Sequence, residues 1–329
     1  MSAEMPAIDR TGDGGNTGNT RNALVVGYDG SAGAERALEL AADLSDRLSA
    51  SLTIARSWRP TPNPSAVVQL TEQPHSTAED AAIASEELMR DCSAVVNKHP
   101  NLVVHYTVDA ASPADLLCQI SQDARMLVVG SRGLGGLAGM MLGSVSSRCL
   151  HQSASPVLVV PQRELRPAIR QRPTRIFPPD VGITPSIAEG SIVVGYDGSP
   201  HALRALREAL RLAGQLSVPV AIIQTWSFDT APEGSRWKDG YAASYPEIAH
   251  EVLLQLEQAT KPITAARPQV AAQCFAVLGY PAEVLVRASE SAAMMIVGSR
   301  GRGGFAGLLL GSISTQCAHR ALCPVLVVR

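Results

Sequence analysis

The hydrophobic residues of the chain gather in short runs that alternate with longer segments of helical spacing. Runs such as ALVVG from Ala23 and MLVVG from Met126 are apolar at nearly every position, which is typical of strands in a parallel sheet covered on both faces. In the first half the runs predict strands over Ala23–Gly27, Ser51–Ser57, Leu102–Val108, Met126–Gly130 and Pro156–Val160. We therefore expect a sheet of parallel strands.

The segments between the expected strands have the apolar period of an α-helix. One set, at positions i, i+3, i+4, i+7 and i+11 of a single helix face, is Ala37, Leu40, Ala41, Leu44 and Leu48. In the second half, Ser199 followed by Pro200 is typical of a helix start, because serine caps the first turn and proline fits it. Alternating strands and helices predict an open, doubly wound α/β domain with right-handed crossovers and a ligand at the carboxyl ends of its strands.

The chain repeats itself at a fixed offset of 168 residues. The segment VVGYDGS occurs at Val25–Ser31 and again at Val193–Ser199, and PVLVV begins at Pro156 and again at Pro324. Of the 22 residues from Met126 to Ser147, 14 recur identically in Met294–Thr315. We infer a tandem duplication of one unit.

The duplication sets the expected domain boundaries. Residues 1–22 are rich in Gly, Asn, Thr and Asp and predict a disordered tail. Residues 161–190 hold six prolines and five arginines without a sustained apolar period, which predicts a tether. We expect a tail at 1–22, a first domain at 23–161, a Pro/Arg-rich linker at 162–189 and a second domain at 190–329.

Composition narrows the class of protein. The 329 residues are 46% hydrophobic and 18% charged, which is ordinary for globular domains, and the net charge of -2 predicts no nucleic-acid partner. The six cysteines form no C-x-x-C pair, so we expect neither a zinc site nor a disulfide framework and place the protein in the cytoplasm. The longest uncharged stretches fall short of the ~20 residues that span a bilayer, so no membrane insertion is expected.

The strongest functional signal follows the fourth expected strand of each copy. Gly130-Ser-Arg-Gly133 is followed by nine residues and Gly143-Ser144, and the second copy repeats this arrangement from Gly298 to Ser312. We call residues 130–144 and 298–312 the glycine loops. Glycines let backbone N–H groups approach phosphate oxygens, and the helices expected over Val145–Gln152 and Ile313–Arg320 would add their N-terminal amides. A flexible surface loop is the alternative, but both copies agree at every glycine of the motif.

An aspartate after the first strand is the second signal. In a doubly wound sheet the carboxyl end of the first strand opens onto the crevice that receives the fourth-strand loop. Asp29 and its twin Asp197 could therefore bind a ribose hydroxyl or a magnesium ion, or serve only as turn residues of YDGS. Gly27 and Gly195, at the strand ends, would leave room for the ligand.

Together these motifs resemble those of a known family. VVGYDGS after the first strand, with G-x2-G-x9-G-[ST] after the fourth, resembles the ATP-binding branch of the universal stress protein family in its tandem form. The resemblance covers about 23–160 and 191–329. It implies five parallel strands per domain, one bound ATP in each, and pairing through the last strands, from Pro156 and Pro324, so that a homodimer of tandem chains is expected.

The resemblance also implies which residues surround the nucleotide. Asp29 and Asp197 would face the ribose or the metal, and Ala55 and Ile223 are candidates for the adenine contact. The phosphates would lie among the residues of the first glycine loop, Gly130, Ser131, Arg132, Gly133, Leu134, Gly135, Gly136, Gly143 and Ser144. Their counterparts in the second loop are Gly298, Ser299, Arg300, Gly301, Arg302, Gly303, Gly304, Gly311, Ser312 and Ile313.

Other nucleotide-binding classes fit less well. Gly133–Ala138 and Gly301–Ala306 match G-x-G-x-x-A, but the dehydrogenase fingerprint follows the first strand and needs an acidic residue about 20 positions later. A P-loop needs G-x4-G-K-[ST], and neither loop contains lysine. Arg132 and Arg300 could neutralise phosphate charge, yet no Asp, Glu or His lies within either loop to orient water.

Four further residues repeat at the same offset without a clear catalytic role. His151 and His319 lie about two turns into the last helix, where a helix-surface role is expected. Cys149 and Cys317 are expected to be small buried residues.

The aromatic segment 227–246 of the second copy could form a lid or a partner surface, or simply cover the core.

We therefore expect an ATP-binding regulator of a stress or dormancy response, acting through an unknown protein partner, with magnesium accompanying ATP and no catalytic residues. The alternatives are a slow magnesium-dependent ATP hydrolase and a nucleotide-independent scaffold.

Overall fold

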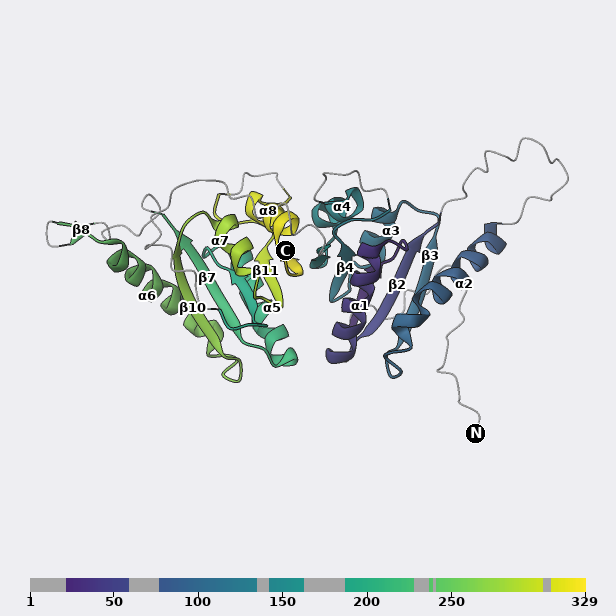
Figure 1. The fold of residues 1–329 in the computed structure, drawn as a ribbon, viewed down its shortest axis with the longest axis horizontal. Coiled ribbons are helices and arrows are strands. Elements are labelled where there is room, and N and C mark those ends of the chain that lie inside the picture. The colour runs from purple at the N-terminus through teal and green to yellow at the C-terminus, as the bar shows by residue number, and fades with distance from the viewer. Residues whose placement is uncertain are drawn as a thin grey trace. The chain divides into compact units, whose positions relative to one another are not determined.

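The computed structural model describes residues 22–58, 77–134, 142–162, 187–227, 237–238, 241–303 and 309–329 (Figure 1). The expected tail, apart from residue 22, and most of the expected linker lie outside these residues, as do Gly135, Gly136 and Gly304. The chain divides into two compact units, of which the first contains residues 1–136 and 143–155 and the second contains 137–142 and 156–329. Each unit is described below by itself.

The first unit is built on four parallel strands with β1 in the interior. Their order is β4-β1-β2-β3, so β1 pairs with both β2 and β4. The strands are β1 (Ala23–Gly27), β2 (Ser51–Ser57), β3 (Val104–Asp109) and β4 (Met126–Gly130). The helices are α1 (Ala32–Arg47), α2 (Thr77–Val96), α3 (Pro113–Ile120) and α4 (Ser144–Gln152). All five residues of β4 are buried, which agrees with a sheet covered on both faces.

The second unit repeats this arrangement. Its parallel strands run in the order β10-β7-β6-β11-β12. They are β6 (Ile192–Gly195), β7 (Val220–Trp226), β10 (Ala272–Leu278), β11 (Met294–Gly298) and β12 (Val325–Val328). The helices are α5 (Pro200–Leu216), α6 (Tyr245–Thr264), α7 (Pro281–Ala288) and α8 (Ser312–Arg320). The tandem α/β fold expected from the sequence is confirmed.

The fifth strand of the first copy, β5 (Val157–Val160), pairs with the last strand of the second. Leu158 lies opposite Leu326 in an antiparallel register, and Val159 lies opposite Val325. All four residues of β5 are buried. Because of this pairing, β5 belongs structurally to the second unit, although it ends the first copy of the repeat.

Serine caps explain where the first helix of each copy begins. The Ser31 hydroxyl accepts a hydrogen bond from the Ala34 N–H at 3.2 Å, and the Ser199 hydroxyl accepts one from Ala202 at 3.1 Å. Pro200 occupies the first turn of α5, as the sequence predicted. The caps satisfy donors that a helix start leaves open, and they fix both helices directly after the YDGS turn.

Two boundaries differ from expectation for local reasons. The strand expected at Leu102 begins at Val104, because the Leu102 N–H donates to the His99 carbonyl and closes a turn after α2. The strand expected at Pro156 begins at Val157, since proline has no N–H to donate.

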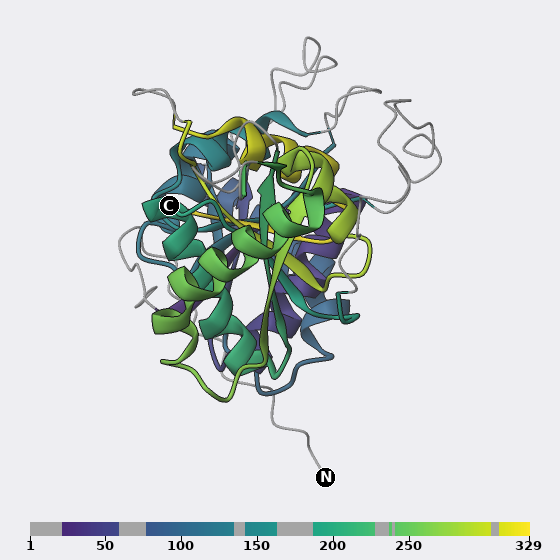
Figure 2. The same cartoon turned by 90° about the vertical axis from the view of Figure 1, so that its left-hand side faces the viewer.

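The second copy has a small element whose counterpart in the first copy, residues 69–74, lies outside the described residues. A two-stranded antiparallel ribbon, β8 (Trp237–Lys238) and β9 (Tyr241–Ala242), precedes α6. Helix α6 packs through Ile248 and Val252 on Trp226 of β7, and Figure 2 shows this helix in front of the strands of its own unit.

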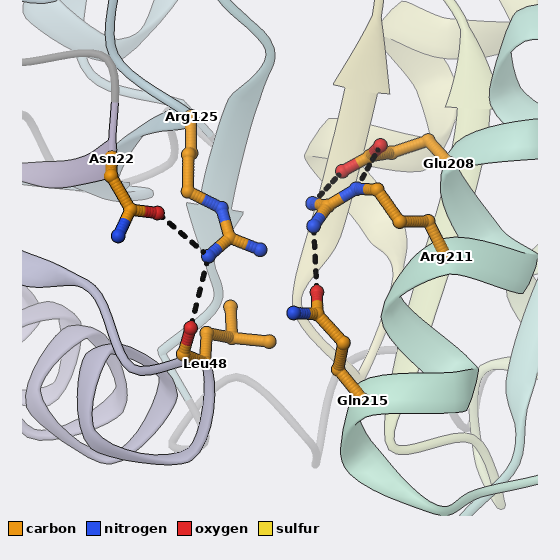
Figure 3. Close-up of polar contacts among 6 residues, drawn as sticks. All are labelled: Asn22, Leu48, Arg125, Glu208, Arg211 and Gln215. Carbon is orange, nitrogen blue, oxygen red and sulfur yellow. Dashed lines mark hydrogen bonds and ion pairs between the residues drawn. The ribbon is translucent and has the colours of Figure 1, made fainter.

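Polar surface contacts also differ between the two copies. In the first unit, Nη1 of Arg125 donates to Oδ1 of Asn22 at 3.2 Å and to the Leu48 carbonyl at 3.1 Å (Figure 3). In the second unit, the Arg211 guanidinium donates twice to Glu208 and once to Gln215 (Figure 3). The duplicated fold therefore carries two different surfaces.

No described helix is both long and apolar enough to cross a membrane.

Candidate functional site

The candidate site of each copy lies where two neighbouring strands end at the same edge of the sheet. In the first unit Val26 of β1 lies opposite Val128 of β4, so both strands lead toward the same crevice. In the second unit Val194 of β6 lies opposite Ile296 of β11. The segments that follow these strands are the YDGS turn and the glycine loop, which are thereby brought together.

The aspartate of the YDGS turn joins the two segments. Oδ1 of Asp29 accepts the Ser31 N–H at 3.0 Å, and Oδ2 accepts the Leu134 N–H at 3.0 Å. The second copy repeats both contacts, at 2.9 Å each, among Asp197, Ser199 and Arg302. The turn role considered for this aspartate is therefore present, and the same carboxylate also fastens the glycine loop.

That contact explains why glycine precedes the fastened residue. A Cβ on Gly133 would lie 2.3 Å from Oδ2 of Asp29, and one on Gly301 would lie 2.4 Å from Oδ2 of Asp197. Real Cβ atoms do not approach so closely, because the atoms would overlap. The glycine lets the carboxylate reach the loop backbone.

A second close approach places the strand end against the first turn of the helix. A Cβ on Gly130 would lie 2.6 Å from the carbonyl carbon of Gly33 in α1. In the second copy a Cβ on Gly298 would lie 2.7 Å from the carbonyl carbon of His201 in α5. These glycines allow strand and helix backbones to touch beneath the loop.

The glycines at the ends of β1 and β6 have a different environment from the one expected. A Cβ on Gly27 would lie 2.7 Å from Cδ1 of Leu117, and one on Gly195 would lie 2.9 Å from Cδ1 of Leu285. A leucine side chain from α3 or α7 thus fills the space beside each glycine. A ligand contact at Gly27 or Gly195 stays a prediction.

The far end of each glycine loop is closed by the backbone. The Gly143 N–H donates to the Ser131 carbonyl at 2.7 Å, and the Gly311 N–H donates to the Ser299 carbonyl at 2.7 Å. The loops therefore return to their starting points, and helices α4 and α8 begin beside the ends of β4 and β11.

The N-termini of α4 and α8 are free of side-chain caps. Gly143 and Gly311 occupy the cap positions, and because they have no side chain they supply no capping hydrogen bond to the first-turn amides. Ser144 and Ser312, the first helical residues, are exposed. Since the positive end of the helix dipole and the free amides both favour an anion, each site is suited to a phosphate group.

Two buried serines, which the sequence analysis did not identify, connect the helix after each glycine loop to the strand before it. The Ser146 hydroxyl donates to the Gly130 carbonyl at 2.6 Å, and the Ser314 hydroxyl donates to the Gly298 carbonyl at 2.6 Å. Both side chains are buried. Their identity in the two copies was the available signal, and the bonds tie each helix to the strand before its loop.

An arginine in each loop carries a buried donor. Nε of Arg132 and Nε of Arg300 are shielded from solvent and have no hydrogen-bond partner among the described residues. The hydroxyl-bearing neighbours Ser131 and Ser299 are themselves buried. The guanidinium groups are thus available for a further acceptor, and an anion would supply it.

Among the described residues, the two glycine loops have different amino acids at the position whose N–H is bonded to the aspartate. Leu134 has 75% of its side-chain surface exposed, and its counterpart is the exposed Arg302. Gly303 has open space where a side chain would be, and Ile313 is half-buried in α8.

The candidates for the adenine contact lie inside the sheet. Ala55 of β2 and Ile223 of β7 are 2% and 1% exposed. Their carbonyl groups accept the N–H groups of Tyr28 and Tyr196, each at 2.9 Å. Their role toward an adenine ring stays a prediction.

The repeated cysteines are buried as expected, whereas the repeated histidines are half-buried instead of lying on the helix surface. Nδ1 of His151 donates to the Ser147 carbonyl within α4 at 2.7 Å, and burial lowers the pKa of His319. Cys149 and Cys317 are fully buried, and burial raises the pKa of Cys317 to about 12. A hydrogen bond to Cys118, together with burial, raises the pKa of Cys149. High pKa values disfavour the reactive thiolate form.

Part of the aromatic segment 227–246 can be placed. The ring of Tyr245, at the start of α6, lies 6.3 Å from that of Trp226, and the Tyr245 side chain is 46% exposed. Phe228 and the side chains of Trp237 and Tyr241 lie outside the described part of the chain. A lid or partner surface here stays a prediction.

A metal site made only of protein ligands is absent from the described residues, because no three His, Cys, Asp or Glu side chains cluster there. Magnesium in nucleotide sites is instead held by one or two carboxylates together with phosphate oxygens and waters. Each oxygen of Asp29 and Asp197 accepts one N–H and retains a further lone pair. These carboxylates therefore fit a magnesium ion that arrives with a nucleotide.

Comparison with known proteins gives a consistent result. The sequence model of the universal stress protein family matches residues 20–161 and 190–329. A universal stress protein of Mycolicibacterium smegmatis is 28% identical over 319 residues, which span 94% of this chain and 98% of that protein. A universal stress protein of Mycobacterium tuberculosis strain H37Rv is 29% identical over 318 residues, spanning 94% and 97%.

The fold is similar to that of a solved structure. The crystal structure of a universal stress protein from Archaeoglobus fulgidus DSM 4304 matches with a TM-score of 0.60 at 20% sequence identity. The match covers 94% of this chain and 98% of that one. At this identity the similarity establishes a common architecture.

Proposed function

Because the chain belongs to the universal stress protein family, which matches it once in each half, we propose that each half binds one ATP at its glycine loop. The protein would then act as a nucleotide-dependent regulator of a stress or dormancy response, with little or no turnover. The domains that carry this function are 23–161 and 190–329.

The observation that carries the proposal is the shared geometry of the two loops. In both copies an aspartate fastens the start of the loop, and the loop ends on a helix whose N-terminal amides have no side-chain cap. The buried Nε of Arg132 or Arg300 lies in the same segment. Amides, a helix dipole and a guanidinium together match the charge and the acceptor-rich surface of a phosphate chain.

Each group has a part in binding. The amides at the start of α4 and the Ser144 hydroxyl would donate to phosphate oxygens, and Arg132 would neutralise charge. Asp29 would hold the ribose or a magnesium ion. Magnesium supplies charge neutralisation of the phosphates when it is bound. The corresponding groups of the second copy are Ser312, Arg300 and Asp197.

The residue types in the loops support binding without turnover. Phosphoryl transfer needs a group that positions the attacking nucleophile. Neither glycine loop contains Asp, Glu or His, and the ring of His151 is engaged with the Ser147 carbonyl. ATP would instead order the loop and bias a surface that a protein partner reads, which requires different affinities for two states. We place this function in the cytoplasm and expect a homodimer of tandem chains.

A count of bound nucleotide tests the proposal. The purified protein is denatured, and the released nucleotide is identified and counted by chromatography and mass spectrometry. We expect nearly two ATP per chain, and a rise in unfolding temperature with added ATP and magnesium. Ligand at 100 times its Kd stabilises the native state by about 2.7 kcal/mol. Absence of both signals with every adenine or guanine nucleotide would leave the loops as structural elements and favour the scaffold.

A double substitution links the signal to the loops. Gly143→Glu together with Gly311→Glu should abolish binding, because a carboxylate at each helix start repels the phosphates and fills their place. The matched control is Gly143→Ala with Gly311→Ala, because a Cβ at these two positions has its nearest contacts at 3.5 and 3.4 Å and adds no charge. Retained ATP affinity in the glutamate double variant would contradict the site.

A further inference from the structure

The two glycine loops differ in charge at the residue that the aspartate fastens. In both copies the aspartate accepts the N–H of the residue after the second glycine of the motif, which is Leu134 in the first copy and Arg302 in the second. The main-chain geometry is the same, so the side chains leave the loop from equivalent positions. One copy presents an apolar side chain there and the other a cation.

The Arg302 guanidinium does not extend away from the site. A Cβ on Gly198, in the turn after β6, would lie 2.3 Å from Nη2 of Arg302. A Cβ on the equivalent Gly30 would have no atom of a described residue within 4 Å. Arg302 therefore reaches from the glycine loop back across the YDGS turn, beside Asp197, while no described residue of the first copy occupies the same space.

The positive charge of Arg302 affects the pKa of a neighbouring tyrosine. Burial raises the pKa of Tyr196, which precedes Asp197, and the Arg302 guanidinium acts in the opposite direction. The Arg302 side chain is also exposed, so an incoming ligand can contact it. A cation at the mouth of the second site is thus both close to Asp197 and accessible.

The other charged groups do not cancel this difference. Arg132 and Arg300 are equivalent, as are Arg36 and Arg204 at the start of the following helix. His201 replaces Gly33, but burial, followed by Arg204 and Arg300, lowers the pKa of His201. His201 is therefore mostly neutral at pH 7.

A carboxylate in the first copy adds to the charge difference between the two sites. In the first copy Oε2 of Glu35 accepts the hydroxyl of Tyr28 at 2.8 Å, directly before Asp29. Leu203 occupies the position of Glu35 in the second copy, and it carries no charge. The guanidinium carbon of Arg56 lies 5.3 Å from the centre of the Tyr28 ring, but Arg56 is paired with Asp91 at 2.7 Å. The first site thus has Glu35 as an additional anion and lacks the cation of the second.

We propose that the two sites are not equivalent, and that Arg302, lying against Gly198 beside Asp197, makes the second site more selective for triphosphate nucleotides over less charged ones. This inference rests on the proposed nucleotide binding. A guanidinium forms charge-assisted hydrogen bonds to phosphate oxygens, and its contribution grows with the charge of the phosphate chain. The first site, with Leu134, would discriminate less between ATP and AMP.

Single-site variants of the full chain test the proposal. Gly143→Glu leaves the second site and Gly311→Glu leaves the first, and each variant is titrated with ATP and with AMP by calorimetry in the presence of magnesium. We expect a larger ratio of ATP to AMP affinity at the second site. In the chain without blocking substitutions the difference should appear as two classes of ATP site, which keeps the test valid where a blocked variant does not fold.

Exchange of the two side chains provides the matched controls. Arg302→Leu, which copies the residue of the first site, should weaken ATP binding at the second site about tenfold and change AMP binding less, as expected for loss of a charged hydrogen bond. Arg302→Lys should retain part of the preference. Leu134→Arg should raise the ATP preference of the first site. An unchanged unfolding temperature shows that the exchanges preserve the fold.

The outcomes distinguish this inference from the proposed nucleotide binding on which it rests. If both sites bind ATP and their ratios of ATP to AMP affinity are equal and insensitive to Arg302→Leu, the inequivalence is wrong while nucleotide binding stands. If neither nucleotide binds the unmodified chain, nucleotide binding itself is wrong.

Discussion

Asp29 and Leu134 are 105 residues apart in the sequence, and a single hydrogen bond from the Leu134 N–H to Oδ2 of Asp29, 3.0 Å long, joins the turn after β1 to the glycine loop. The equivalent bond joins Arg302 to Asp197 in the second copy. The loop is therefore held at its start by a side chain and at its end by the backbone bond from Gly143 to Ser131.

Removal of the carboxylate charge should release the start of the loop. Asp29→Asn keeps one acceptor oxygen for two N–H donors, so one of the bonds from Ser31 and Leu134 is lost, at a cost of about 1–3 kcal/mol. We expect faster hydrogen exchange at the Leu134 amide, a lower unfolding temperature and weaker ATP binding. Asp123→Asn, at an exposed turn position, is the control. Unchanged exchange at Leu134 would contradict the fastening role.

A methyl group on Gly133 should have a similar effect through crowding. Its Cβ would lie 2.3 Å from Oδ2 of Asp29, so Gly133→Ala must displace the carboxylate. We expect about 1–3 kcal/mol of destabilisation, the usual range for overpacking, measured by denaturant unfolding. At Gly143 a Cβ would have its nearest contacts at 3.5 Å, so Gly143→Ala should change stability by less than about 0.5 kcal/mol. Equal effects of the two exchanges would refute this account.

The buried bond beneath the loop predicts a contrast between two neighbouring serines. Ser146→Ala removes the donor to the Gly130 carbonyl and leaves that acceptor buried, which should cost about 1–3 kcal/mol. Ser144→Ala, at an exposed position, should leave the unfolding temperature nearly unchanged and weaken ATP binding if the Ser144 hydroxyl contacts phosphate. Thermal unfolding and an ATP titration of both variants separate structural support from ligand contact.

Two histidines predict a loss of stability in acid. Burial lowers the pKa of His201 and of His319 in the folded state, so the unfolded chain binds these protons at a higher pH than the folded chain. Their contribution to stability is present above the ordinary histidine pKa of about 6.5 and is lost as the pH falls through the folded values. We expect His201→Gln to reduce the fall in unfolding temperature between pH 7.5 and pH 5. His105→Gln, at an exposed position of β3, is the control, and an equal reduction there would argue against a specific role of His201.

The elements whose residues interact locally could be predicted from the sequence. The apolar run of β4 and the Ser199–Pro200 start of α5 depend on neighbours along the chain, and both are confirmed. The offset of 168 residues then transferred each prediction to the other copy. The tandem α/β fold could be recognised for this reason.

The parts that could not be predicted depend on contacts across the fold. Leu117 fills the space beside Gly27, and no local pattern shows that a helix from another part of the chain supplies this side chain. The contact of Arg302 with Gly198 also joins distant segments. Ser146 was overlooked because a buried hydroxyl and an exposed one look alike in sequence.

The starts of β3 and β5 differ from the predicted starts for local reasons, which are the turn at Leu102 and the proline at position 156.

The antiparallel pairing of β5 with β12 has a consequence for how the protein can be divided. A fragment that begins at residue 190 contains every strand of the second copy but lacks β5, so the backbone N–H and C=O groups of one side of β12 lose their partners. Such an unpaired strand edge is a template for association with other chains. A fragment that begins at residue 156 keeps this side of β12 paired with β5, so the boundary of the repeat and the boundary of a fragment with a paired β12 differ by one strand.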